Sequence, residues 1–275
     1  MKLLDYLHDK IWLPRILFLL IIFNFSAIFL SYSQNDSLKS PIYINKIKGE
    51  FINVDSQGNL YILMDSYLYK YSLTGELQYS FTNFMLGSIT SVDVSNPSKI
   101  MLFYKESGVL IFLNEQLAPI TEIIDLRSMN FNTVLLAAFS TTNNIWLYDY
   151  ANMDLISLDF NMNLKNKIQY SFQNFQPKQM TVIDEKQIAI FTPEIGIRFF
   201  DSFGTFQKSS AITSDKFIQI TDTYIYYLKG NIIHCYNYIK LDESTVELKI
   251  ENIIQCLVYR DKYILLTEDG TVIIY

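Results

Sequence analysis

A unit of about 40 residues that repeats along the chain constrains the fold more than any other feature. Its second strand is a short apolar and aromatic run that recurs at intervals of 37 to 45 residues. An apolar strand precedes each copy, and a tight connection and a third strand follow it. The copies are NLYILMD (59–65), KIMLFYK (99–105), NIWLYDY (144–150), QIAIFTP (187–193), YIYYLKG (224–230) and YILLTED (263–269). Short strands at this period are typical of β-propeller blades.

The ends of the repeat predict how the ring closes. A fourth, more polar strand follows the third in five copies, but the sixth copy stops at Tyr275 after its third strand. The missing strand is available in PIYINKI (41–47), directly before the first copy. Pairing it with the last blade leaves no open sheet edge between the termini. The sequence therefore predicts an all-β, six-bladed β-propeller over residues 41–275, closed by its N-terminal strand.

The turn DSQGNLY (55–61) resembles the commonest blade turn of six-bladed propellers of the broad NHL/TolB-like kind. The resemblance covers the whole repeat region and implies an architecture. Such propellers include enzymes, receptors and scaffolds, so the resemblance implies no particular function.

The first 33 residues differ from the rest of the chain. A basic start leads into the apolar run ILFLLIIFNFSAIFL (16–30), and small residues follow at Ser31 and Ser33. This order predicts a secretory signal peptide over residues 1–33, followed by a short linker over 34–40. The run is shorter than the roughly 20 residues of a membrane-spanning helix, although an uncleaved anchor is the alternative. We therefore expect an exported protein that is periplasmic or associated with the outer membrane.

Charge and rare residue types narrow the function classes. The net charge of −6 and the scarcity of basic clusters argue against nucleic acid as a partner. We expect contact with a membrane only through the N-terminal segment or through a partner protein. His234 is the only histidine beyond the signal segment, which excludes sites built from several histidines. Cys235 and Cys256 lie in apolar strands and are expected to be buried free thiols.

Three aspartates are candidate metal ligands. Asp55, Asp184 and Asp222 follow the innermost strands of the first, fourth and fifth blades, near one mouth of the predicted channel. Carboxylates that converge there would suit Ca²⁺. The alternative is that each aspartate caps its own turn. The other blades carry Ser95, Ser140 and Arg260 at this place, so the ring of ligands is incomplete.

Three phenylalanines are candidates for partner binding. Phe84, Phe131 and Phe175 each follow an asparagine in a connection between blades, which places them on the opposite face. Exposed, they would form an apolar arc typical of a protein-binding surface. The alternative is that each fills the seam between two blades. The same face collects acidic loop residues, which favours a neutral or basic partner: Asp65, Glu106, Glu194, Glu268 and Asp269.

These observations favour a non-catalytic binding or scaffold propeller of a bacterial cell envelope, with a protein partner and no cofactor. The main rival is a Ca²⁺-dependent hydrolase or lactonase-type propeller with channel carboxylates. A carbohydrate-binding propeller is the third hypothesis, because exposed aromatic rings stack on sugars. Trp146, however, lies in an apolar strand and is expected in the core.

Overall fold

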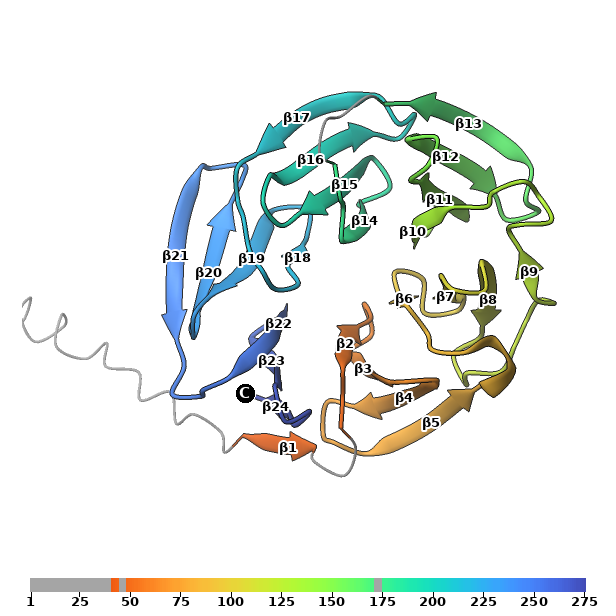
Figure 1. The fold of residues 1–275 in the computed structure, drawn as a ribbon. Helices are drawn as coiled ribbons and strands as arrows, with labels where there is room; N and C mark the ends of the chain where they lie inside the picture. Colours follow the sequence, from red (N-terminus) through yellow and green to blue (C-terminus); the bar gives the residue numbers. More distant parts are fainter. Residues whose placement is uncertain (1–40, 45–47, 171–174) are drawn as a thin grey trace, which may run out of the picture. The chain divides into compact units, whose positions relative to one another are not determined.

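The computed structural model describes residues 41–44, 48–170 and 175–275, and it shows a ring of six four-stranded sheets (Figure 1). The predicted signal peptide and linker, residues 1–40, lie outside the described residues. Residues 41–275 form one compact unit. Within the described ranges, no helix is long and apolar enough to cross a membrane.

Each blade is an antiparallel meander that runs from an inner strand to an outer one. Blade 1 consists of β2 (Phe51–Val54), β3 (Asn59–Met64), β4 (Tyr67–Ser72) and β5 (Leu77–Thr82). Blade 2 consists of β6 (Ser91–Asp93), β7 (Ile100–Tyr104), β8 (Val109–Leu113) and β9 (Ile124–Asp125). Blade 3 consists of β10 (Val134–Phe139), β11 (Asn144–Asp149), β12 (Asp154–Asp159) and β13 (Leu164–Gln169).

The second half of the ring follows the same plan. Blade 4 consists of β14 (Gln179–Ile183), β15 (Gln187–Thr192), β16 (Gly196–Asp201) and β17 (Phe206–Ser210). Blade 5 consists of β18 (Gln219–Ile220), β19 (Tyr224–Lys229), β20 (Ile232–Asn237) and β21 (Asp242–Glu247). Blade 6 contains β22 (Ile253–Tyr259), β23 (Lys262–Thr267) and β24 (Val272–Ile274).

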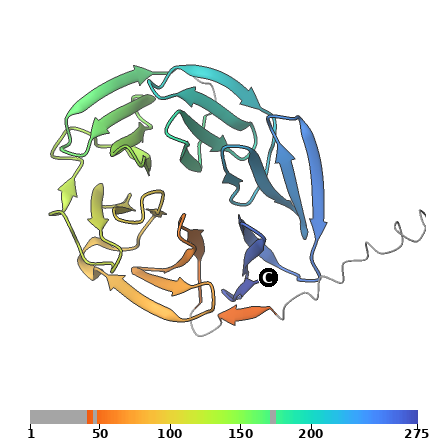
Figure 2. The ribbon, with the colours of Figure 1, turned by 180° about the vertical axis from the view of Figure 1, so that it is seen from behind.

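Blade 6 is completed by the N-terminal strand, as the sequence predicts. β1 (Ile42–Ile44) pairs antiparallel with β24, with Ile42 opposite Ile274 and Ile44 opposite Val272. Figures 1 and 2 show β1 at the outer edge of this blade, next to the end of the chain. The first and last strands of the propeller thus share one sheet, which joins the two ends of the ring.

Blade 2 departs from the expected pattern at its outer edge. The predicted fourth strand ITEIIDL (120–126) is reduced to the two residues of β9. Before it, Leu113 pairs with Pro119 in an isolated bridge. Proline has no N–H to donate to a strand ladder, which explains why regular pairing does not continue from this point.

The core is divided among the six seams between blades. One apolar cluster fills each seam, and its members come from the two sheets that face each other. Trp146 lies in the cluster between blades 3 and 4, as predicted. Cys235 and Cys256 are free thiols buried between blades 5 and 6, also as predicted. The aliphatic and aromatic strand residues therefore stabilise the ring by packing blade against blade.

Polar side chains reach across most seams at the inner strands. We call them the inner-strand clamps: each side chain bonds to the backbone of the next blade around the ring. Gln255 is the most buried, and it accepts from the N–H of Ile52 at 2.9 Å and donates to the carbonyl of Ile52 at 2.8 Å. The clamp residues are Asn53, Asp93, Gln179, Gln219 and Gln255.

Five of the six seams have such a clamp, and the seam between blades 3 and 4 is the exception. Among the described residues, no side-chain hydrogen bond joins β10 to β14. The reason lies in the sequence of β10, because its channel-lining residues Leu135, Leu136 and Ala137 have no polar side-chain atoms. This seam depends on apolar packing alone at its inner edge.

Candidate functional site

Asp55 is held by its own turn. Its carboxylate accepts from the N–H groups of Gln57 and Asn59 at 2.9 and 2.8 Å. It also accepts from the Asn59 side-chain amide at 2.8 Å and from the Tyr61 hydroxyl at 3.0 Å. Burial, followed by the nearby Asp55 carboxylate, raises the pKa of Tyr61, so this hydroxyl stays protonated and keeps donating. Asp55 is 2% exposed, and both of its carboxylate oxygens accept hydrogen bonds from this turn and from Tyr61.

The other two aspartates do not join Asp55. Asp184 adopts a left-handed backbone conformation (φ 44°) and forms an exposed ion pair with Lys186 at 3.6 Å. Asp222 is exposed, and the hydroxyl of its neighbour Thr221 caps the turn by accepting from the N–H of Tyr224 at 2.9 Å. In the described part of the chain, no three His, Cys, Asp or Glu residues gather as metal ligands would. The three aspartates thus do not converge into one set of carboxylates.

The three phenylalanines lie in three different environments, so the expected exposed arc does not form. Phe84 is 67% exposed and lies roughly perpendicular to the Tyr67 ring, at 5.4 Å between centroids. Phe131 is partly buried against the cluster between blades 2 and 3. Phe175 is 5% exposed, because it packs edge-on against Tyr148 at 5.3 Å in the seam between blades 3 and 4. Of the three, Phe84 is the most exposed.

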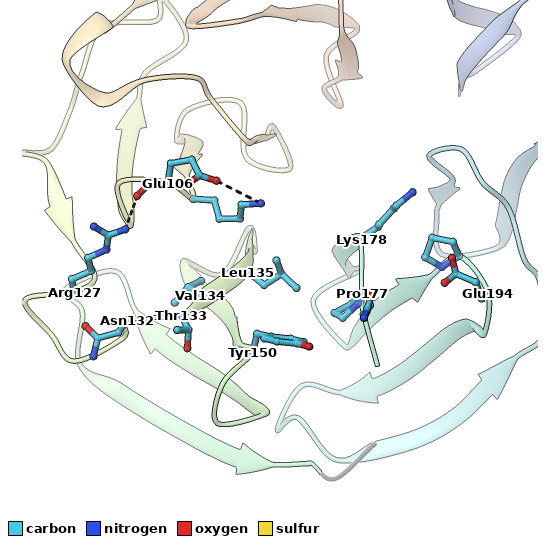
Figure 3. Close-up of a pocket in the computed structure, with 13 residues that line it drawn as sticks. Glu106, Arg127, Asn132, Thr133, Val134, Leu135, Tyr150, Pro177, Lys178 and Glu194 are labelled. Carbon is cyan, nitrogen blue, oxygen red and sulfur yellow. Dashed lines mark hydrogen bonds and ion pairs between the residues drawn. The ribbon is translucent and has the colours of Figure 1, made fainter. Parts of the chain in front are cut away.

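The face that carries these connections has a pocket. We call it the connection face; it contains the segments between successive blades and the turns between second and third strands (65–66, 105–108, 150–153, 193–195, 230–231 and 268–271). The pocket has a volume of about 540 Å³, within the range of about 300–1,000 Å³ that suits ligand sites. Segments of blades 2, 3 and 4 line it, and their side chains surround a common space (Figure 3).

The pocket has an apolar centre and a charged rim. Leu135, Tyr150 and Pro177 lie at its centre in Figure 3, with Val134 beside Leu135. Tyr150 is 48% exposed. The rim carries charges of both signs, which come from Lys105, Glu106, Arg127, Lys178 and Glu194. The acidic face that the sequence suggested is therefore mixed in charge at its pocket.

The pocket and the central channel are neighbours. Leu135 and Lys178 line both the pocket and the channel, a cavity of about 420 Å³ bounded by the inner strands. These two residues come from blades 3 and 4, the pair of blades that has no inner-strand clamp. The pocket is therefore located at the one seam whose inner edge is apolar.

Further exposed apolar side chains lie in the connections and turns of the same face. The 3₁₀ turn η1 (Phe84–Leu86) presents Met85, which is 88% exposed, next to Phe84. The Ser107 hydroxyl donates to the carbonyl of Leu86 at 2.7 Å, which fixes η1 beside the turn that carries Lys105 and Glu106. On the other side of the pocket, Met153 and Ile195 are exposed in turns of blades 3 and 4.

The single histidine of the propeller lies elsewhere. His234 on β20 bonds through Nδ1 to the carboxylate of Glu243 on β21 at 3.0 Å and stacks on the ring of Tyr227. The Tyr227 hydroxyl donates to the same carboxylate, and this bond, followed by the one from His234, lowers the pKa of Glu243. The group links the outer strands of blade 5.

Sequence reasoning found Phe84 but missed the pocket. Lys105 stands in the same turn as Glu106, and Lys178 stands in the same connection as Phe175, whereas the turn of Tyr150 contains none of the residues singled out from the sequence. The sequence feature that could have indicated the pocket is in β10, where apolar residues replace the polar inner-strand residues of the other blades. What a sequence could not show is which side chains of three blades face one space.

Comparisons with known proteins support the fold. The sequence matches no protein-family model and no curated protein. The WD40 domain of Neurospora crassa Pan2 is similar in structure, with a TM-score of 0.58 at 11% identity over 82% of this chain and 88% of that one. A streptogramin B lyase has a TM-score of 0.57 at 11% identity over 86% of each chain. BBS1N, solved in complex with ARL6DN, has a TM-score of 0.52 at 16% identity over 83% and 78%. At these identities the likeness shows the fold alone, and the chain is a six-bladed β-propeller.

Proposed function

We propose that this protein is a non-catalytic binding propeller of the bacterial cell envelope, which presents its connection face to a protein partner. The observation that carries the proposal is the group of exposed apolar side chains on the connection face. Phe84, Met85, Tyr150, Met153 and Ile195 are exposed on one face. Apolar groups that collect beside a pocket with a polar rim are typical of protein-binding surfaces.

Two further points support a protein partner. BBS1N, which has a similar fold, was solved in complex with ARL6DN, so a propeller of this kind is compatible with protein binding. The aromatic side chains Phe84 and Tyr150 are also of the type that dominates binding energy at interfaces. The envelope location follows from the signal-like sequence of residues 1–33 and is part of the proposal.

The test is a crosslinking pull-down of the tagged full chain from intact cells. Tyr150→Ala and the double variant Phe84→Ala/Met85→Ala remove exposed groups from the connection face. Phe203→Ala is the matched control, because Phe203 is 71% exposed in the turn between β16 and β17 on the opposite face.

We expect a stoichiometric partner with the wild type and with Phe203→Ala, and its loss with both connection-face variants. Circular dichroism checks that every variant is folded. Wild-type protein that comes down alone would contradict the proposal, and so would a partner that only Phe203→Ala loses.

A further inference from the structure

One cation of the pocket rim, Lys178, is not engaged by the part of the chain that the structure describes. Within residues 41–44, 48–170 and 175–275, the amino group of Lys178 makes no hydrogen bond or ion pair. In Figure 3 its side chain extends away from Pro177. A lysine at the wall between a pocket and a channel is thus available to an anionic group.

The other two cations of the rim are only partly engaged. Lys105 and Glu106 form an ion pair of 3.9 Å between exposed side chains, and pairs of this kind are weak. Arg127 donates from one terminal nitrogen to the backbone carbonyl of Glu106, which leaves further N–H donors on the guanidinium. The rim therefore has more donor capacity than its own two carboxylates use.

The centre of the pocket adds an apolar requirement. Leu135, Val134 and the pyrrolidine ring of Pro177 provide aliphatic surface, and Tyr150 provides an aromatic ring. A ligand that fills this space must have an apolar part close to its anionic group. The exposed side chains of η1 beyond the pocket would contact a ligand longer than the pocket itself, which favours a chain segment over a small molecule.

From this arrangement we infer that the pocket binds a linear acidic segment of the protein partner. A carboxylate of the segment contacts the amino group of Lys178, and an adjacent apolar side chain packs on Leu135 and Tyr150. The inference rests on the proposed function and names the chemistry of its site. Glu194, on the next turn, disfavours acidic groups at its own side of the pocket and so restricts the carboxylate to the side of Lys178.

Zero-length crosslinking with a carbodiimide tests the inference directly, because the reagent joins a carboxylate to an amine only when the two are in contact. The tagged full chain is treated in intact cells, and the crosslinked peptides are identified by mass spectrometry. We expect a link between the Lys178 amino group and an aspartate or glutamate of the partner.

Three variants complete the test. Lys178→Gln should weaken capture of the partner about tenfold, because a charge-assisted hydrogen bond is lost. Lys178→Arg should retain the partner but lose the crosslink, since its charge remains and its reactive amine does not. Lys186→Gln is the control, because Lys186 is exposed in the β14–β15 turn on the opposite face.

The outcomes separate this inference from the proposed function. A partner that is captured through the connection face but crosslinks through Glu194 to a lysine of its own would overturn the acidic segment alone. So would unchanged capture by Lys178→Gln. If no partner is captured by the wild type, the proposed function itself fails.

Discussion

The seam between blades 3 and 4 differs from the other five in what holds its inner edge. In the other seams, an amide or carboxylate side chain bonds to the backbone of the next blade, as Gln219 does to both the N–H and the carbonyl of Val258. In the seam between blades 3 and 4, apolar residues of β10 face β14. A hydrogen bond fixes the relative position of two strands by its direction, whereas apolar contacts do not.

The difference indicates how a closed ring can acquire a binding site. Each inner-strand clamp satisfies one or two backbone groups of the next blade within the ring. Where the clamp is absent, the same place in the fold has an apolar pocket with a charged rim. Substitutions at the seam between blades 3 and 4 and at the clamped seams should therefore have different effects on stability.

The largest effect is expected from Phe175→Ala. Phe175 is buried between Tyr148 and Arg198, and the Arg198 guanidinium lies 4.6 Å from the centroid of the Phe175 ring. This seam has no inner-strand clamp that would also stabilise it. Removing a buried phenylalanine costs about 3–5 kcal/mol of the free energy of unfolding. Urea denaturation measures the loss. Phe84→Ala is the control and should change stability by less than about 0.5 kcal/mol. Equal losses in the two variants would contradict the burial difference.

Gln255→Ala should have the next largest effect, because it breaks a buried clamp between blades 6 and 1. The N–H and carbonyl of Ile52 would both lose their partners, and an unsatisfied buried group costs about 1–3 kcal/mol. We expect a loss of about 3 kcal/mol in urea denaturation. Gln207→Ala on the exposed strand β17 is the matched control. A loss no greater than that of the control would show that the clamps do not stabilise the ring.

Leu136→Gln introduces the missing clamp. Leu136 lies four residues before Ser140, where the turn between the first and second strands of blade 3 begins. Gln179 and Gln255 lie four residues before the corresponding turns of blades 4 and 6. Its amide can therefore reach the backbone of Met180, the counterpart of Ile52 and Ile218. We expect a stability gain of about 1 kcal/mol, as one net hydrogen bond provides. Leu136→Ala controls for the lost leucine. If the glutamine variant is no more stable than the alanine variant, the clamp position is wrong.

The smallest effect concerns pH and the clamp residue Asp93. Burial raises the pKa of this carboxyl and outweighs the hydrogen bonds from the N–H groups of Phe139 and Ser95. The folded protein thus holds the proton more tightly than the unfolded chain, so this contribution to stability is complete below the ordinary value of 3.8 and is lost as pH rises through the folded value.

Asp93→Asn cannot ionise, so its stability relative to the wild type should increase with pH. Urea midpoints measured between about pH 3 and pH 7 check this slope. Parallel pH curves for the two proteins would show that Asp93 does not titrate across this interval.

The architecture could be predicted from sequence because it depends on a repeated pattern. Six copies of one strand pattern and a missing outer strand were sufficient to predict both the blade number and the closure by β1. The shortening of β9 was not predicted, because the repeat pattern takes no account of the effect of Pro119 on strand pairing.

The site was less predictable, because it depends on burial and on contacts between blades. Phe84, Phe131 and Phe175 share a sequence pattern, yet only the packing of each connection determines that the first is exposed and the third is buried. Likewise, the sequence could not distinguish a capping aspartate from a metal ligand at Asp55, where the contacts of the turn decide.

The central claim is that the partner binds on the connection face at the seam between blades 3 and 4. Hydrogen–deuterium exchange of the full chain, with and without the captured partner, tests it most directly. The account predicts slower exchange in segments 132–135 and 150–153 when the partner is bound, and no change in the opposite-face turn 202–205. Protection of that turn, with 132–135 and 150–153 unaffected, would contradict the account.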